Sequence, residues 1–159
     1  MYRNVLIATD GSELAQKALD HGMAMARAIN AKVTVVTVSE PFQAFSVQPR
    51  MVTDTREQYE RQVAACAAEY LAAAKKAASA AGVTCETVHV ESAHPYQGII
   101  DTATQRGCDL IVMASHGRRG ISAIVLGSET VKVLTHSTIP VLVYRGARAG
   151  LSSPYFAAS

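Results

Sequence analysis

Five short, strongly apolar runs, separated by segments of helical character, restrict the fold of this chain more than any other feature of its sequence. Most of these runs show no alternation between apolar and polar residues, which is typical of strands buried on both faces of a parallel sheet. Because no tight hairpin turn joins consecutive runs, each connection is expected to cross over the sheet through a helix. We expect strands at residues 4–9, 32–38, 83–91, 110–114 and 141–144.

Helix start and stop signals stand in the intervals between these strands. Ser12 suits the N-cap of the first helix, and Pro95 suits the first turn of the third. The second helix is long and rich in alanine, and we expect it over residues 53–81, with Gly82 at its C-terminal end. A fourth helix is expected to begin at Ser128.

The segment before the second helix, residues 39–52, contains two prolines and no clear period. We therefore expect a loop that lies over the strand ends as a partial lid. Its apolar side chains, Phe42, Phe45 and Val47, have an alternative position in which they pack down on the core.

The alternating elements indicate an α/β protein with a single doubly wound, parallel, five-stranded sheet and helices on both faces. Ligands bind to such sheets beyond the carboxyl ends of the strands, where the strand order reverses. The pattern is compatible with the orders 2-1-3-4-5 and 3-2-1-4-5 and does not choose between them. With 159 residues the chain has the length of one domain, which we expect at residues 1–145, followed by a flexible C-terminal tail at residues 146–159.

Residues 109–129 pass from a buried strand through a loop with glycines and arginines to the start of a helix. Gly117 lets a ligand approach the backbone closely, and Arg118 and Arg119 belong to no apolar period. The free N–H groups in the first turn of the following helix, together with the helix dipole, favour an anion. The stretch therefore predicts a phosphate site. The alternative is an ordinary structural loop with two solvated arginines.

The segment Ala114–Gly117, followed after nine residues by Gly127 and Ser128, resembles the nucleotide-binding signature G-x2-G-x9-G-[ST] of universal stress proteins. Ala114 stands where the signature has its first glycine, and the other positions match. The segments Ile7–Ser12 and Ile139–Tyr144 are similar to the opening and closing strands of the family. The resemblance extends over roughly residues 1–145 of the chain.

The resemblance implies the strand order 3-2-1-4-5, which places Asp10 beside Ala114 and the phosphate loop. It also implies a bound adenine nucleotide, ATP or an AMP-like relative, with Thr9 and Val38 near the adenine and Asp10 near the ribose. Asp10 has an alternative role as a cap of the first helix, and it is also the nearest candidate to hold Mg²⁺ through phosphate oxygens. The nucleotide-binding residues expected on this basis are Thr9, Asp10, Val38, Ala114, Gly117, Arg118, Arg119, Gly127, Ser128 and Glu129.

The function implied by the resemblance is a nucleotide-binding regulatory module of the stress response with little or no turnover. The alternative is a dimeric interaction or scaffold module whose nucleotide site is vestigial. The retained Gly117, Gly127 and Ser128 favour the first function.

No catalytic residue is assigned from the sequence. The chain contains none of the motifs G-x4-G-K-[ST], G-x-G-x-x-G and G-x-S-x-G. Ser115 and His116 are adjacent, and adjacent residues do not easily place a hydroxyl against an imidazole with an orienting acid behind it.

Composition argues against several other classes of protein. The net charge is only +2 and the basic residues are scattered, which predicts no nucleic-acid surface. The apolar runs are far shorter than the ~20 residues that cross a bilayer, so we expect no membrane span. Residues 1–10 lack the apolar core of a signal peptide, which favours a cytoplasmic location.

The cysteines and histidines do not have the spacing of a metal or redox site. Cys66, Cys85 and Cys108 form no C-x-x-C pair, and the five histidines show no H-x3-H spacing. We therefore expect free thiols and no metal site built by the protein.

The last strand predicts an assembly. In the order 3-2-1-4-5, Val141–Tyr144 lies at a sheet edge, where its unpaired backbone groups favour antiparallel pairing with a second copy around a two-fold axis. We therefore expect a homodimer, as the family resemblance also implies. In the alternative, the tail folds back over this edge through Leu151, Tyr155 and Phe156 and keeps the protein monomeric.

Overall fold

The centre of the sheet consists of two neighbouring strands that are almost completely buried, β1 (Asn4–Ala8) and β4 (Leu110–Ala114). In their parallel register Leu6 lies opposite Ile111, and neither side chain is exposed. Both strands consist mainly of apolar residues without alternation, because helices cover both faces of the sheet and leave no side for water.

The computed structural model describes residues 1–43, 49–117 and 125–146. Its sheet has the order β3-β2-β1-β4-β5 with every adjacent pair parallel, which confirms the predicted α/β class and the order 3-2-1-4-5. The remaining elements are β2 (Lys32–Ser39), β3 (Cys85–Glu91), β5 (Val141–Tyr144), α1 (Glu13–Ala28), α2 (Pro49–Ala81), α3 (Pro95–Gln105) and α4 (Ser128–His136).

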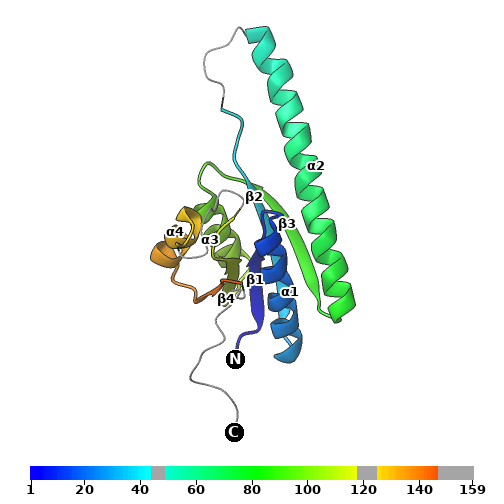
Figure 1. The fold of residues 1–159 in the computed structure, drawn as a ribbon, viewed down its shortest axis with the longest axis vertical. Coiled ribbons are helices and arrows are strands. Elements are labelled where there is room, and N and C mark those ends of the chain that lie inside the picture. Colours follow the sequence, from blue (N-terminus) through cyan, green and yellow to red (C-terminus); the bar gives the residue numbers. More distant parts are fainter. Residues whose placement is uncertain (44–48, 118–124, 147–159) are drawn as a thin grey trace, which may run out of the picture.

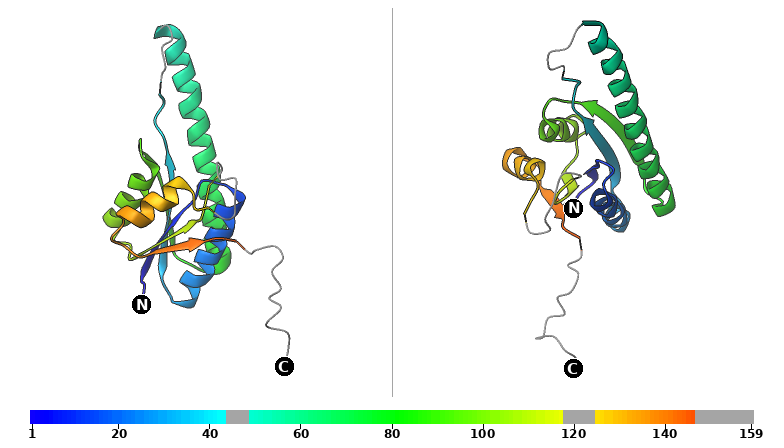
Figure 2. Two further views of the ribbon diagram at one scale, coloured as in Figure 1. Left: turned by 60° about the vertical axis from the view of Figure 1, so that its left-hand side comes forward. Right: turned by 45° about the horizontal axis from the view of Figure 1, so that its top comes forward.

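The helices lie in two layers, with α1 and α2 on one face of the sheet and α3 and α4 on the other (Figures 1 and 2). Successive side chains of β1 point alternately to the two helix layers. Val5 and Ile7 pack with Leu19 of α1 on one face, whereas Leu6 packs with Ile99 of α3 on the other. The reversal of strand order between β1 and β4 therefore lies between two complete apolar layers.

The start of α2 corrects the predicted loop at residues 39–52. The helix begins at Pro49, four residues before the expected start at Thr53, and extends beyond the end of the sheet (Figure 1). Proline is favoured at the first helical position, where its missing N–H costs no hydrogen bond, so Pro49 starts a helix instead of marking a loop. The middle of the predicted lid, residues 44–48, lies outside the described residues, and Phe45 and Val47 lie there.

The described part of that segment is tied to α2. The Tyr59 hydroxyl of α2 donates a hydrogen bond of 2.8 Å to the Glu40 carbonyl, which follows β2. The rings of Phe42 and Tyr59 lie 5.5 Å apart between their centroids, and the Arg56 guanidinium lies 5.8 Å from the centre of the Phe42 ring. Phe42 therefore packs against α2 and not on the core of the sheet.

The predicted helix ends agree with the structure at the capping residues. The Ser12 hydroxyl accepts a hydrogen bond of 3.2 Å from the Ala15 N–H at the start of α1. Gly82 ends α2 with a φ of 68°, a left-handed conformation in which glycine is favoured. The Val83 N–H then bonds to the Ala78 carbonyl, so Val83 completes the helix end and β3 begins at Cys85, two residues later than expected.

The N-terminal ends of β1 and β4 are joined by the Asp109 carboxylate. It accepts hydrogen bonds from the backbone N–H groups of Arg3, at 2.9 Å, and Asn4, at 3.0 Å. Burial raises the pKa of the Asp109 carboxyl, but these hydrogen bonds from the backbone lower it by more, so its pKa lies below the ordinary value. The depressed pKa means that the ionised carboxylate stabilises the fold.

We predict that Asp109→Asn lowers the free energy of unfolding by about 1–3 kcal/mol at neutral pH, because a charged acceptor is lost. A carboxyl group whose pKa is lower in the folded than in the unfolded state stabilises the folded protein at pH values above its unfolded pKa of about 3.9. This stabilisation is lost as the pH falls through the folded pKa. The difference between wild type and variant should therefore shrink below about pH 4. Urea unfolding across this pH range measures it, with exposed Asp20→Asn in α1 as the control. A difference that is independent of pH would contradict the role of the charge.

Candidate functional site

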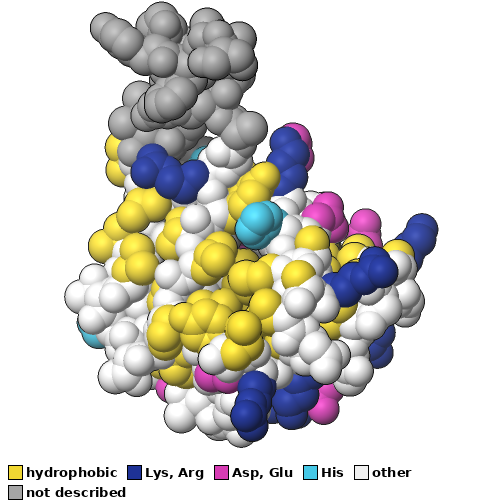
Figure 3. Space-filling model, turned by 90° about the horizontal axis from the view of Figure 1, so that it is seen from below, with side chains coloured by type: hydrophobic (Ala, Val, Ile, Leu, Met, Phe, Trp, Pro, Cys, Tyr) yellow, Lys and Arg dark blue, Asp and Glu magenta, His cyan; other side chains and the backbone are white. Residues whose placement is uncertain are grey.

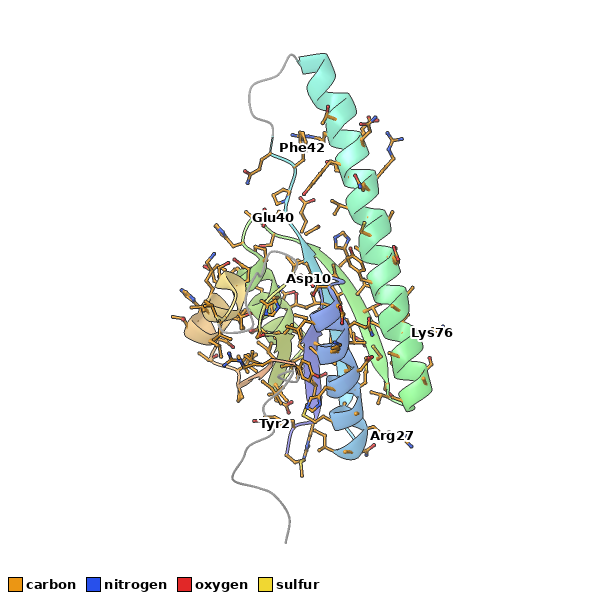
Figure 4. The ribbon with its side chains drawn as sticks, in the orientation of Figure 1. Tyr2, Asp10, Arg27, Glu40, Phe42 and Lys76 are labelled. Carbon is orange, nitrogen blue, oxygen red and sulfur yellow. The ribbon has the colours of Figure 1, made fainter. Side chains whose placement is uncertain are left out.

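A cavity of about 390 Å³ opens at the carboxyl ends of β1, β2 and β4. Asp10 and Glu40, which belong to its lining, lie toward one end of the sheet, whereas Tyr2 and Arg27 lie at the opposite end (Figure 4). The cavity is therefore at the position where doubly wound sheets bind ligands. Eight of the ten predicted nucleotide-binding residues line it: Thr9, Asp10, Val38, Ala114, Gly117, Gly127, Ser128 and Glu129.

Asp10 lies beside the loop that follows β4, as the strand order predicts. Its Oδ1 atom accepts a hydrogen bond of 3.0 Å from the Ser12 N–H, so it helps to cap α1. Its Oδ2 atom occupies the space that a Cβ atom on Gly117 would need. Gly117 does not have a positive φ, so glycine is favoured here by the close approach of the carboxylate, which a larger residue would have to displace, and not by the backbone conformation.

Gly127 holds the N-terminal end of α4 against the same loop. Its N–H donates a hydrogen bond of 2.7 Å to the Ser115 carbonyl, and a Cβ atom on Gly127 would lie only 3.2 Å from the Cα of His116. The N–H of Gly127 is thus engaged within the protein, and the backbone of this predicted nucleotide-binding residue does not supply a donor for a phosphate. The small size of Gly127 allows the close contact.

The backbone donors for an anion therefore come from the first turn of α4. The first intrahelical hydrogen bond of α4 runs from the Val131 N–H to the Gly127 carbonyl, at 3.0 Å. The N–H groups of residues 128–130 precede it and have no acceptor within the helix. Together with the helix dipole, they favour a negative group at the cavity wall formed by Ser128.

Ala114 is accommodated without a distortion of this site. It is buried in a cluster with Ala15 and Ala18 of α1, and its carbonyl accepts a hydrogen bond of 3.1 Å from the Thr130 hydroxyl of α4. The methyl group that distinguishes alanine from glycine is therefore part of the packing between β4 and α1. The Thr130 hydrogen bond attaches α4 directly to the end of β4.

Thr9 and Val38 form the part of the wall contributed by β1 and β2. The Thr9 N–H bonds to the Val36 carbonyl at 3.0 Å, and its carbonyl accepts a hydrogen bond of 3.1 Å from the Thr37 hydroxyl. Val38 is half-buried and packs close to Gly98 of α3. A Cβ atom added to Gly98 would lie only 3.0 Å from the Cγ1 atom of Val38. This end of the cavity is apolar and rigidly connected to the sheet.

Glu129 lies at the cavity wall but directs its carboxylate toward α3. Its Oε2 atom accepts a hydrogen bond of 2.8 Å from the Tyr96 N–H, and its Oε1 atom lies 2.9 Å from the Lys132 ammonium. Both oxygens are thus engaged within the protein. This arrangement places Glu129 between α3 and α4.

Comparison with known proteins identifies the family. The model of the Universal stress protein family matches residues 1–145. The chain belongs to this family. Universal stress protein YxiE of Bacillus subtilis is 31% identical over 153 residues, which cover 91% of this chain and 100% of that protein. A universal stress protein of Thermus aquaticus is 30% identical over 145 residues, with 91% and 100% covered.

Solved structures have the same fold. The hypothetical protein MJ0577 superposes with a TM-score of 0.75 at 28% identity, and the match covers 91% of this chain and 96% of that one. A universal stress protein crystallised in complex with cAMP has a TM-score of 0.62 at 29% identity, with 89% and 96% covered. These structures support the doubly wound sheet described above.

The site of this universal stress protein includes residues that the sequence did not single out. Glu40, Pro95, Ile99 and His116 also line the cavity. Glu40 directly follows β2 and His116 closely follows β4, so their position after a predicted strand was an available signal. Pro95 and Ile99 reach the cavity only because α3 packs beside α4, which no local pattern encodes. Arg118 and Arg119 lie outside the described residues.

Ser115 and His116 are in contact although they are adjacent, but this contact includes no orienting acid behind the imidazole. The Ser115 Oγ atom lies 3.2 Å from the His116 Nδ1 atom. Ser115 is only 3% exposed, and it is not one of the residues that line the cavity. Its hydroxyl is therefore placed to orient the His116 ring and not to attack a ligand.

Within residues 1–43, 49–117 and 125–146, no group of three or more histidine, cysteine, aspartate or glutamate side chains is placed to hold a metal ion. In the same ranges, no helix has the length and the apolar character needed to cross a membrane.

Proposed function

We propose that this universal stress protein binds an adenine nucleotide, ATP or an AMP-like relative, in the cavity at the ends of β1, β2 and β4. The observation that carries the proposal is that apolar side chains such as Val38 and Ile99 and the first turn of α4 line one and the same cavity. Its volume of about 390 Å³ is in the range of small-molecule sites. The related structure in complex with cAMP also supports it.

The positions of the lining residues suggest how the nucleotide lies. We place the adenine near Thr9 and Val38, the ribose near Asp10, and the phosphates at the first turn of α4, which begins at Ser128. Arg118 and Arg119 are proposed to add positive charge at the phosphate end. Asp10 is the candidate that would contact Mg²⁺ bound to the phosphate oxygens.

The proposed role is that of a regulatory module in the stress response, located in the cytoplasm, with little or no turnover of the nucleotide. Residues 1–145 are proposed to form its functional domain. Asp10 and Glu129 accept hydrogen bonds from backbone N–H groups, which gives them structural roles in place of proton transfer. A scaffold with a vestigial site is the outcome to be expected if no nucleotide binds.

A homodimer through β5 is also proposed. β5 is an edge strand whose side chains are half-buried, and apolar side chains gather on the side of the molecule seen from below (Figure 3). The Ile111 and Ser115 N–H groups of β4 bond to the Pro140 and Tyr144 carbonyls. In a parallel pair this register directs the N–H of Val143 away from β4, toward the open edge.

Replacement of Gly127 by valine is predicted to lower ATP affinity at least tenfold. A side chain at this position collides with His116 and displaces the loop from the α4 terminus, which disrupts the anion site. Calorimetric titration with ATP measures the effect. Gly82→Ala is the control, because it strains a positive φ far from the cavity and should leave ATP affinity unchanged. An unchanged affinity in Gly127→Val would show that the nucleotide binds elsewhere.

Turnover is predicted to be slow or absent. A phosphate-release assay with ATP and purified protein should give a rate well below about 1 per second, a value at the low end of ordinary enzymes. A faster rate that is lost in Gly127→Val would establish an enzyme and reject the binding-module proposal.

The dimer is predicted to depend on the outward-facing N–H of Val143. Light scattering should give a dimer for the wild type and a monomer for Val143→Pro, because proline removes one donor at the edge while the β4–β5 hydrogen bonds remain. Val143→Ala keeps the N–H and should stay dimeric. A monomeric wild type would reject the dimer, and a dimeric proline variant would place its interface elsewhere.

A further inference from the structure

The N-terminal ends of α3 and α4 are connected by one side chain, Glu129. The residue before α3, His94, makes no side-chain capping bond, so α3 lacks a cap of its own. Glu129, in the first turn of α4, supplies it across the gap between the helices: its Oε2 atom accepts the Tyr96 N–H at 2.8 Å. A carboxylate at this position also interacts favourably with the dipole of α3.

The two connected helix ends form different parts of the cavity wall. Pro95 and Ile99 of α3 line the cavity, and Ile99 packs in the same cluster as Val38, where we place the adenine. Gly127 and Ser128 of α4 line the cavity where we place the phosphates. The hydrogen bond from Tyr96 to Glu129 therefore joins the helix beside the proposed base end to the helix at the proposed phosphate end.

The second oxygen of the Glu129 carboxylate forms an ion pair. This Oε1 atom lies 2.9 Å from the Lys132 ammonium, one turn further along α4, and this ammonium lies 5.6 Å from the centre of the Tyr96 ring. The ion pair is partly exposed, with Glu129 34% and Lys132 46% accessible, so its own contribution to stability is small. The pair offsets the negative charge of Glu129 near the proposed phosphate end, whereas the other oxygen of the carboxylate makes the bond to α3.

We propose that Glu129 is a positioning residue that sets the spacing between the base end and the phosphate end of the cavity. This inference rests on the proposed nucleotide-binding function. A ligand that engages both ends at once gains affinity only if their spacing matches its length. Adenine nucleotides span both ends, whereas adenosine and inorganic tripolyphosphate each occupy one. Glu129 thereby favours nucleotides over either fragment without touching the ligand.

Two substitutions separate the length of the Glu129 side chain from its charge. Glu129→Asp keeps the charge in the first turn of α4 but is one methylene too short to reach the Tyr96 N–H. Glu129→Gln keeps the length and an oxygen acceptor but removes the charge. The matched control is Lys132→Ala, which removes the ion pair and leaves the hydrogen bond to Tyr96 in place.

The experiment is calorimetric titration of each variant with ATP, adenosine and tripolyphosphate. For Glu129→Asp we expect ATP affinity to fall about tenfold, while adenosine and tripolyphosphate affinities stay within about twofold of the wild type, because only simultaneous engagement is impaired. Intact binding of the two fragments also shows that the variant is folded. Lys132→Ala should bind ATP within about twofold of the wild type, and Glu129→Gln should lose less ATP affinity than Glu129→Asp.

Other results would overturn the inference in distinguishable ways. Equal losses for all three ligands in Glu129→Asp would indicate a merely structural role, and an unchanged ATP affinity would show that the spacing does not depend on Glu129. A loss of ATP affinity in Glu129→Gln as large as in Glu129→Asp would assign the effect to charge. A wild-type protein that binds no ATP would reject the proposed function itself, and the positioning role with it.

Discussion

The parallel pairing of β1 with β4 is the contact on which the rest of the structure depends. These strands are neighbours in the sheet although about 100 residues separate them in the chain, and their apolar side chains are shielded by helices on both faces. The pairing brings Asp10 to the loop after β4, where its carboxylate takes the space above Gly117. It also creates the reversal of strand order at which the cavity opens.

Two hydrogen bonds, one from the backbone and one from a side chain, attach the N-terminal end of α4 to the end of β4. The Gly127 N–H bonds to the Ser115 carbonyl, and the Thr130 hydroxyl bonds to the Ala114 carbonyl. Both acceptors lie at the carboxyl end of β4, so the last unpaired carbonyls of the strand become the anchor of the helix. The free N–H groups of the helix then face the cavity, and the glycine signature acts through close packing more than through backbone flexibility.

The acidic residues of the cavity illustrate how structural and functional roles combine. Asp10 accepts the N–H of Ser12, the N-cap residue of α1, and Glu129 accepts the Tyr96 N–H in the first turn of α3. The carboxylate oxygen that accepts such a bond is held toward the protein backbone. The proposed site therefore binds through shape and helix ends, which is consistent with a binding module of little turnover.

Much of the fold was determined by local sequence. The buried runs at β1 and β4, Ser12 at the start of α1 and Gly82 at the end of α2 act over a few residues, so the strands and the helix ends were predictable. The strand order required the family resemblance, because alternation alone permits two topologies. Only the tertiary structure decided that Glu129 caps α3 and that the Gly127 N–H is engaged, since these bonds join segments whose proximity arises from packing and not from sequence spacing.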